Sequence, residues 1–278
     1  MTAPRLRPEI DSLPAYKAGQ MPAPRTDIET FKISSNETPF EPPEAVRRAI
    51  ERAAATVHRY PDPFSRRLTG ALARRFDVAQ EQIALGTGSV AVVGQLIWAA
   101  AGPGDSVVYP WRSFEAYPIW VQMTGARSIQ VPLLADERHD LPSMLEAIDD
   151  STRIVFVCNP NNPTGEAVRR DALTEFIDAV PSDVIVVLDE AYREFISDTD
   201  VPDGLDFFHG QNNVVVMRTF SKAYGLAGLR VGFAIAPEPI AEGMRKTALP
   251  FGVSSIAEDA ALAALECEDE LFERVRHL

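Results

Sequence analysis

The chain has 278 residues, of which 46% are hydrophobic, which is enough for one large domain with smaller attachments. The formal net charge of −13 argues against a basic nucleic-acid-binding surface. There is no Cys/His cluster, no N-terminal apolar signal segment and no apolar run of the ~18–20 residues that span a membrane, so we expect a cytoplasmic protein without a disulfide framework or a metal site.

The elements follow one another in a regular order. Residues 1–43 are rich in proline and show little periodicity, so we expect an extended arm with short turns. Apolar residues at helical spacing predict helices over 44–55 and 65–76, the second with Ser65 as its N-cap. Beyond them, strands are predicted at 83–85, 106–109, 128–131, 153–158, 184–188, 214–217 and 231–236, and helices at 89–101, 114–123, 143–148, 172–179 and 268–275.

Alternating strands and helices of this kind predict an α/β fold, a three-layer α/β/α arrangement around a mainly parallel sheet. The predicted strand at 184–188 is fully apolar, which is typical of a sheet buried on both faces. Ligands of such sheets bind at the carboxyl ends of the strands. Since the polar motifs of this chain follow predicted strands, we expect them to form one site at that edge.

Lys222 follows the predicted strand at 214–217, in the segment Ser-Lys-Ala-Tyr-Gly-Leu-Ala-Gly-Leu-Arg at 221–230. The chain has only four lysines. A lysine amine forms a Schiff base with an aldehyde, and neighbouring hydroxyls with Arg230 can hold a phosphate. The segment therefore favours a phosphate-carrying aldehyde cofactor on Lys222 over a solvated surface lysine.

Three further segments lie at predicted strand ends. Gly-Thr-Gly-Ser at 86–89 leads into a helix whose free N–H groups can bind phosphate, although such turns also occur without a ligand. Asn-Pro-Asn-Asn-Pro-Thr-Gly at 159–165 presents an asparagine on a rigid loop, with an ordinary turn as the alternative. Asp189, at the end of an apolar strand, needs a cationic partner such as the protonated nitrogen of a pyridine ring. Tyr192 could reach the same ligand. The alternative is that Asp189 caps the following helix.

Asn-Pro-x-Asn-Pro-Thr-Gly, Asp-Glu-Ala-Tyr at 189–192 and the segment around Lys222 together resemble, in order and spacing, the fold-type I pyridoxal-phosphate-dependent aminotransferases. The resemblance runs from about residue 34 to the end and is greatest to the histidinol-phosphate and aromatic amino-acid aminotransferases. It implies pyridoxal 5'-phosphate as cofactor, amino-acid and 2-oxo-acid substrates, and a homodimer with shared active sites. It implies neither a nucleic-acid nor a membrane partner.

The resemblance also implies roles for the matching residues. Lys222 would bind the cofactor as a Schiff base and shuttle a proton, and Asp189 would pair with the pyridinium nitrogen. Tyr60 would reach the phosphate of the cofactor in the neighbouring subunit, and Tyr192 would be catalytic together with Lys222 and Asp189. The remaining cofactor contacts would be the phenolic-oxygen contacts of Asn162 and Tyr192, the ring contact of Phe114, and the phosphate contacts of Gly88, Ser89, Thr219, Ser221 and Arg230.

Three segments bear on the substrate. Many histidinol-phosphate enzymes carry an acidic pair after the glycine turn, whereas this chain continues Val-Ala-Val at 90–92. The segments at 111–118 and 249–254 are also more similar to phenylalanine-type members. We therefore predict transamination of phenylalanine, tyrosine or tryptophan with a 2-oxo acid such as 2-oxoglutarate. The alternatives are a histidinol-phosphate aminotransferase, a decarboxylase on the same scaffold, and a truncated cofactor-binding homologue without turnover.

The resemblance divides the chain into an N-terminal arm (1–43), a large cofactor-binding domain (44–240) and the start of a small C-terminal domain (241–278). The sequence ends at Leu278 in a predicted helix, whereas family members usually continue for roughly another small domain. That part holds the arginine that clamps the substrate carboxylate, and no residue here matches it. We therefore expect the 278-residue chain to bind cofactor with weak or absent transaminase activity.

Overall fold

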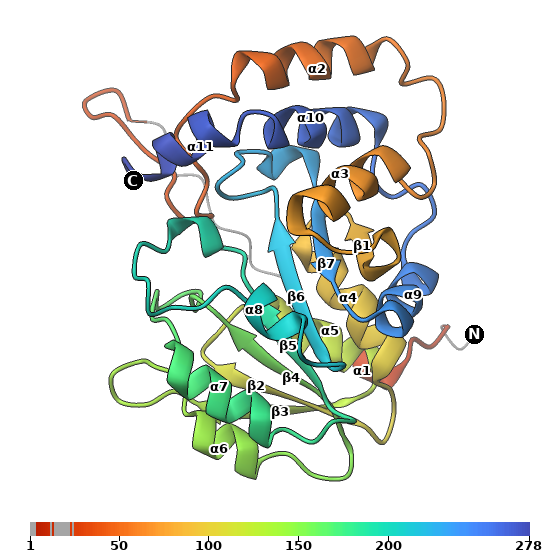
Figure 1. Cartoon of the computed structure of the whole chain (residues 1–278), viewed down its shortest axis with the longest axis vertical. Helices are drawn as coiled ribbons and strands as arrows, with labels where there is room; N and C mark the ends of the chain where they lie inside the picture. Colours follow the sequence, from red (N-terminus) through yellow and green to blue (C-terminus); the bar gives the residue numbers. More distant parts are fainter. Residues whose placement is uncertain (1–3, 12, 14–22, 24) are drawn as a thin grey trace.

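One seven-stranded sheet, of order β1-β7-β6-β5-β4-β2-β3, forms the centre of the computed structural model, which describes residues 4–11, 13, 23 and 25–278 (Figure 1). β7 is antiparallel to β1 and β6, and the other neighbouring strands are parallel, which confirms the predicted α/β fold with a mainly parallel sheet. The strands are β1 (Ile83–Gly86), β2 (Ser106–Trp111), β3 (Arg127–Pro132), β4 (Thr152–Cys158), β5 (Ile185–Asp189), β6 (Val214–Thr219) and β7 (Gly232–Ile235).

Helices pack on both faces of this sheet. The α-helices among the described residues are α1 (Pro8–Asp11), α2 (Glu44–Ala54), α3 (Arg66–Phe76), α4 (Ser89–Ala100), α5 (Ala116–Thr124), α6 (Leu141–Glu146), α7 (Arg170–Ala179), α8 (Leu205–Phe208), α9 (Glu238–Thr247), α10 (Ser255–Leu265) and α11 (Glu268–Val275). Single 3₁₀ turns lie at η1 (Gln80–Gln82), η2 (Arg193–Phe195) and η3 (Ala227–Leu229). None of the described helices is long and apolar enough to cross a membrane.

The sheet separates two hydrophobic cores because successive strand residues point to opposite faces. Val186 and Leu188 of β5 pack in one core with residues of α3, α6, α7 and α10. Val187, between them, packs in the other core with residues of α4, α5 and α9. Every strand from β4 to β6 is buried along most of its length, as its continuous apolar sequence predicts.

Each predicted strand and helix is present, with ends that shift by at most two residues. One predicted cap is wrong. Ser65 occupies the N-cap position of α3, but its side chain makes no capping hydrogen bond. The carboxylate of Asp62 accepts instead from the backbone N–H groups of Phe64 and Arg66, both at 3.1 Å, because the proline-rich turn before α3 brings it there.

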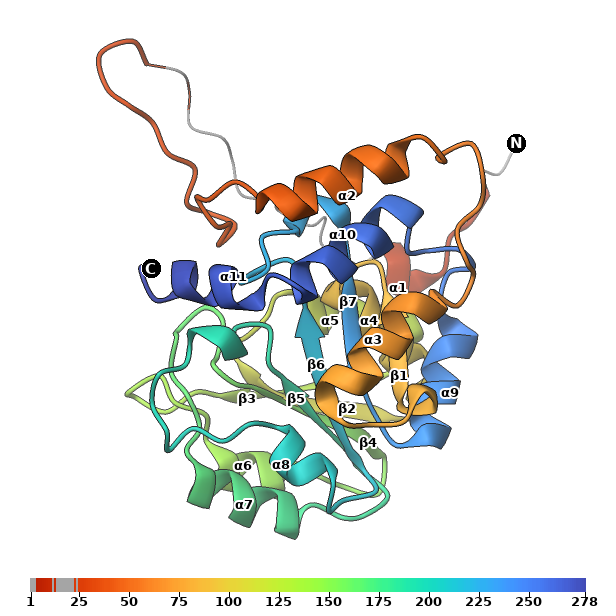
Figure 2. The same cartoon turned by 45° about the horizontal axis from the view of Figure 1, so that its top comes forward.

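Among the described residues, four helices lie where none is predicted: α1 and α8, of four residues each, and the longer α9 and α10. α10 is rich in alanine, and its small residues let it pack closely on α2, beside which it lies in both views (Figure 1, Figure 2). Alanines give only a weak periodic signal. Within the described residues, α9 adds Met244 to one sheet core and α11 adds Leu271 to the other.

The predicted division of the chain at residues 43 and 240 stays a prediction, and part of the predicted arm lies outside the described residues.

Candidate active site

The candidate site is a cavity of about 460 Å³ at the carboxyl ends of β2, β4, β5 and β6. The chain passes from β2 to β3 at the edge and returns to β4 on the other side of β2, which creates the crevice where ligands of α/β sheets bind. Residues 34–36 of the arm form another wall. The cavity brings together nine of the predicted site residues: Ser89, Phe114, Asn162, Asp189, Tyr192, Thr219, Ser221, Lys222 and Arg230.

Lys222 follows β6 and reaches the arm. Its Nζ donates to the carbonyl oxygens of Ser35 at 3.0 Å and Asn36 at 3.3 Å. Burial lowers the pKa of Lys222; the carboxylate of Glu37 opposes that shift and the charge of Arg230 adds to it. A lowered pKa leaves more of the lysine as free amine, which is the nucleophilic form.

Asp189 ends β5 and is buried, with 3% of its surface exposed. Its Oδ2 accepts from the Tyr117 hydroxyl at 2.7 Å, and its Oδ1 accepts from the Ala191 N–H at 3.3 Å. Burial raises the pKa of Asp189, while these two hydrogen bonds lower it. No ion pair found within the described part of the chain includes Asp189. The carboxylate is therefore ready to take a cationic partner from the cavity side.

Tyr117 is a site residue that the sequence analysis does not identify. It lies in α5, is fully buried, and stacks on Phe156 at 4.5 Å between ring centroids. Phe114, predicted to contact the cofactor ring, packs edge-on against it at 5.6 Å. Burial, and to a smaller extent the charge of Asp189, raise the pKa of Tyr117. The hydroxyl therefore stays protonated and donates a hydrogen bond to Asp189. Phe114 and Tyr117 are three residues apart at the start of α5, a spacing that places both rings on one side of the helix. This spacing is the sequence feature from which their contact could have been predicted.

A compact cup forms where the turn before α4 meets the segment around Arg230. Arg230 donates to the Ser221 hydroxyl at 3.2 Å and to the Ala227 carbonyl at 2.8 Å. A Cβ at Gly88 would lie 2.2 Å from Arg230 Nη2, and one at Gly232 would lie 2.3 Å from the backbone nitrogen of the first residue of α4. Only glycines allow this approach, which gathers a guanidinium, hydroxyls and a helix N-terminus. These are the groups that bind a phosphate.

The Asn-Pro-Asn-Asn-Pro-Thr-Gly loop divides its asparagines between two tasks. Asn159 pairs with the backbone of Val168 through both ends of its amide. Asn161 accepts from the Ser113 hydroxyl at 2.7 Å and donates to Thr164 at 3.0 Å. These contacts hold the loop against its neighbours, while Asn162 lines the cavity, as predicted for a cofactor contact.

Tyr60 does not lie at the cavity. Its side chain is 84% exposed, and its ring packs on Phe251 at 4.9 Å between centroids. The predicted contact of Tyr60 with a phosphate therefore requires a second subunit. It stays a prediction.

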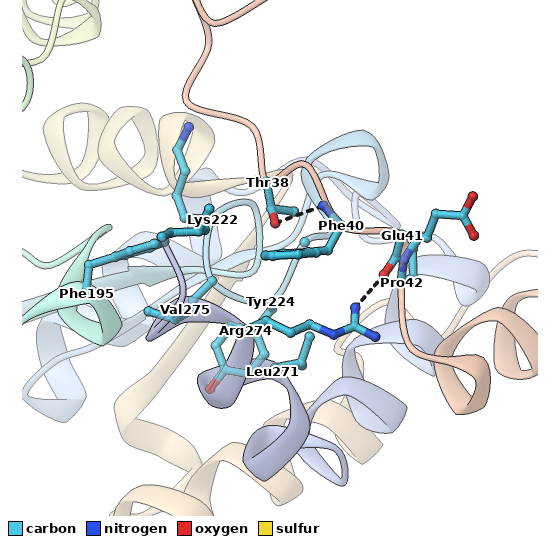
Figure 3. A pocket seen from close by; sticks show the side chains of 13 residues that line it. Thr38, Phe40, Glu41, Pro42, Phe195, Lys222, Tyr224, Leu271, Arg274 and Val275 are labelled. Atoms are coloured by element: carbon cyan, nitrogen blue, oxygen red, sulfur yellow. Dashed lines mark hydrogen bonds between the residues drawn. The ribbon is translucent and has the colours of Figure 1, made fainter.

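A separate small pocket lies between the arm, α11 and the loop after β6 (Figure 3). Its volume of about 10 Å³ is near the space of one water molecule. Arg274 donates to the Glu41 carbonyl and lies 5.9 Å from the ring of Phe40. Figure 3 shows the Lys222 side chain directed away from these residues, so this region anchors the arm to α11 and is not the reaction site.

The family model described as aminotransferase class I and II matches residues 28–278. An aromatic amino acid aminotransferase of Streptomyces coelicolor is 58% identical over 277 residues, which cover 100% of this chain and 77% of that protein. The corresponding protein of Thermobifida fusca is 54% identical over 98% of this chain and 75% of its own length. The crystal structure of histidinol-phosphate aminotransferase from Sinorhizobium meliloti, in complex with pyridoxal-5'-phosphate, has a TM-score of 0.88 and 32% identity over 99% of this chain and 74% of that one.

Proposed function

This chain belongs to the class I and II aminotransferases, and we propose that it moves the amino group between an aromatic L-amino acid and a 2-oxo acid such as 2-oxoglutarate. The observation that carries this proposal is the single cavity that Lys222, Asp189 and the cup around Arg230 share. The substrate class is supported by identities of 54–58% to proteins named aromatic amino acid aminotransferases. The histidinol-phosphate alternative is supported less well, because the structural neighbour of that name is 32% identical.

The residues of the cavity fit pyridoxal phosphate. The cup of Gly88, Ser221 and Arg230 suits its phosphate, and the buried carboxylate of Asp189 suits a protonated ring nitrogen. Phe114 offers an aromatic ring at the same cavity. We propose that Asn162 and Tyr192 contact the phenolic oxygen, with Ser89 and Thr219 completing the cup.

When bound, pyridoxal phosphate supplies an aldehyde for the amine and a ring that accepts electrons. Lys222 provides the amine, and its lowered pKa favours the free form that attacks. With substrate present, the Lys222 amine would be the base that takes the proton from the substrate α-carbon and the acid that gives it to the aldehyde carbon of the cofactor. Asp189 holds a proton on the ring nitrogen, and Tyr117 fixes the direction of that carboxylate.

We also propose a cytoplasmic homodimer in which Tyr60 acts on the site of the neighbouring subunit. The support for this is that Tyr60 is almost fully exposed and lies outside the cavity of its own chain, although it matches the family motif.

The ratio of kcat/KM values for phenylalanine and histidinol phosphate, each with 2-oxoglutarate, tests the substrate class. This ratio does not depend on the absolute turnover. We expect phenylalanine to be preferred by roughly 10-fold or more, because a side-chain pocket without polar groups placed for a phosphate would leave the charged phosphate of histidinol phosphate without partners, which is costly. A preference for histidinol phosphate would favour that alternative. Carbon dioxide release without a 2-oxo-acid product would indicate a decarboxylase, and cofactor binding without any product would indicate a homologue without turnover.

A further inference from the structure

Asn36, in the N-terminal arm, contacts two side chains of the cavity at once. Its Nδ2 donates to the hydroxyl of Tyr192 at 2.9 Å, and its main-chain oxygen accepts from Lys222 Nζ at 3.3 Å. Lys222 Nζ itself lies 5.5 Å from the centre of the Tyr192 ring. A residue 156 positions before Tyr192 in the sequence therefore joins both side chains proposed to act on the cofactor.

The backbone of Asn36 has a shape that few residues adopt. Its φ is 50°, in the left-handed region, which asparagine tolerates better than most residues other than glycine. The ion pair between Lys32 and Glu37 at 2.8 Å closes the arm on itself around Asn36, and the contact of Arg274 in α11 with the Glu41 carbonyl ties the arm to the rest of the chain. A strained conformation that its surroundings hold in place is often found at functional sites.

We propose that Asn36 is a positioning residue for transamination, which directs the hydroxyl proton of Tyr192 into the cavity. This inference rests on the proposed function, in which Tyr192 donates to the phenolic oxygen of the cofactor. A phenol has one proton to donate and lone pairs that accept. Because Tyr192 accepts the N–H of Asn36, its own proton is free for the cavity. Accepting that N–H also makes the hydroxyl a stronger donor.

The consequence is a shift in the titration of the bound cofactor. A strong donor at the phenolic oxygen favours the state in which the nitrogen bonded to the cofactor has lost its proton, since the oxygen then carries more negative charge. Loss of the Asn36 amide therefore moves the midpoint to higher pH. The other groups that act on Tyr192 are Cys158 and Asp189, and Glu37 and Arg230 act on Lys222. All of them are unchanged in the variants below.

The experiment is a pH titration of the visible absorbance of the purified protein with pyridoxal phosphate bound. Asn36→Gly removes the amide and keeps the left-handed backbone, and we expect its midpoint to rise by about 0.5–1 pH unit, the size of one hydrogen bond. Asn36→Asp keeps the shape but can only accept, so its midpoint should rise at least as much. Asp77→Gly, another left-handed residue at the end of α3, is the matched control and should leave the midpoint unchanged.

A second measurement separates positioning from a purely structural role. In a Tyr192→Phe background, Asn36→Gly should cause no further shift, because the hydroxyl through which it acts is gone. An unchanged midpoint in Asn36→Gly or in Asn36→Asp would overturn the inference, as would the same shift with and without the Tyr192 hydroxyl. Absence of any visible band from the wild-type protein would overturn the proposed function, and with it this role of Asn36.

Discussion

The hydroxyl of Tyr117 donates a hydrogen bond of 2.7 Å to Oδ2 of Asp189 and so joins α5 to the end of β5. Both residues are buried. Burial alone favours the neutral carboxyl, whereas a donor at its oxygen favours the charged form. The contact therefore helps Asp189 to keep the negative charge that a protonated ring nitrogen requires.

Tyr117→Phe should weaken the binding of pyridoxal phosphate roughly 10-fold and lower turnover by a similar factor, since a hydrogen bond to a charged group is lost. Fluorescence titration and half-reaction rates measure the two effects. Tyr109→Phe is the control, because Tyr109 packs 5.7 Å from Tyr117 in the same group of rings but its hydroxyl accepts from Gln130. Equal losses in both variants would show that ring packing, and not the bond to Asp189, is what matters.

Gly88→Ala should reduce the affinity for pyridoxal phosphate by at least about 10-fold, because the new methyl group would occupy the position of the Arg230 guanidinium in a left-handed backbone. Gly228→Ala adds the same methyl group nearby, with no atom within 4 Å of it. Equilibrium dialysis of the two variants checks the difference. If both bind as the wild type does, Arg230 has room to move and the cup is not as tight as described.

His139 should make the protein less stable as the pH is lowered from 7 to 5, whereas Glu194, whose pKa burial raises to about 7, should act in the opposite direction. The His139 ring is buried, and neither ring nitrogen has a partner at full hydrogen-bond geometry within the described residues, although the Asn161 side chain is near enough to oppose the lowering of its pKa. Burial lowers the pKa of His139 to about 4, below its ordinary value near 6.5. The unfolded chain therefore binds a proton at His139 in this range that the folded chain does not, and the contribution of His139 to the free energy of unfolding falls by about 2 kcal/mol.

His139→Leu should remove that part of the pH dependence, as measured by urea denaturation at both pH values. His209→Gln, at an exposed position, is the control and should keep the wild-type pH dependence. A His139→Leu protein whose stability changes between the two pH values by the same amount as that of the wild type would contradict the assignment.

Tyr60 should act across a dimer interface. In a hybrid of one Tyr60→Phe subunit and one Lys222→Ala subunit, action in trans leaves one site with both changes and one site intact. The hybrid should then recover about half of the wild-type rate per dimer. Action within the same chain would give each site one change and no recovery above the Tyr60→Phe protein. A monomeric protein would refute this role directly.

The sequence predicts the parts of the site that are continuous motifs at strand ends. Lys222 and Asp189 are of this kind, since a buried apolar strand followed by a polar residue locates each one. The bond between Tyr117 and Asp189 joins residues 72 positions apart, and that between Asn36 and Tyr192 joins residues 156 positions apart. Such contacts depend on which strands are neighbours and on the path of the arm, and neither follows from local patterns.

For the fold as for the site, local sequence patterns predict the elements but not their contacts with distant parts of the chain. The strands were predictable because each is a short apolar run between turns, but their order in the sheet was not. The cap of α3 shows the limit at one residue, because Ser65 has a suitable side chain and Asp62 has the suitable position. α10 was not predicted because its buried face consists mostly of alanines, whereas its larger apolar residues Ile256, Leu262 and Leu265 are only partly buried, so the apolar spacing does not mark the buried face.

The proposed function depends above all on Lys222 as the amine that binds pyridoxal phosphate. Borohydride reduction of the purified protein in the presence of the cofactor, followed by peptide mapping, tests it most directly. We expect a pyridoxyl group on Lys222, retained in Lys246→Ala and lost in Lys222→Ala. A label on Lys246 or another lysine, or no label on the folded wild-type protein, would contradict it.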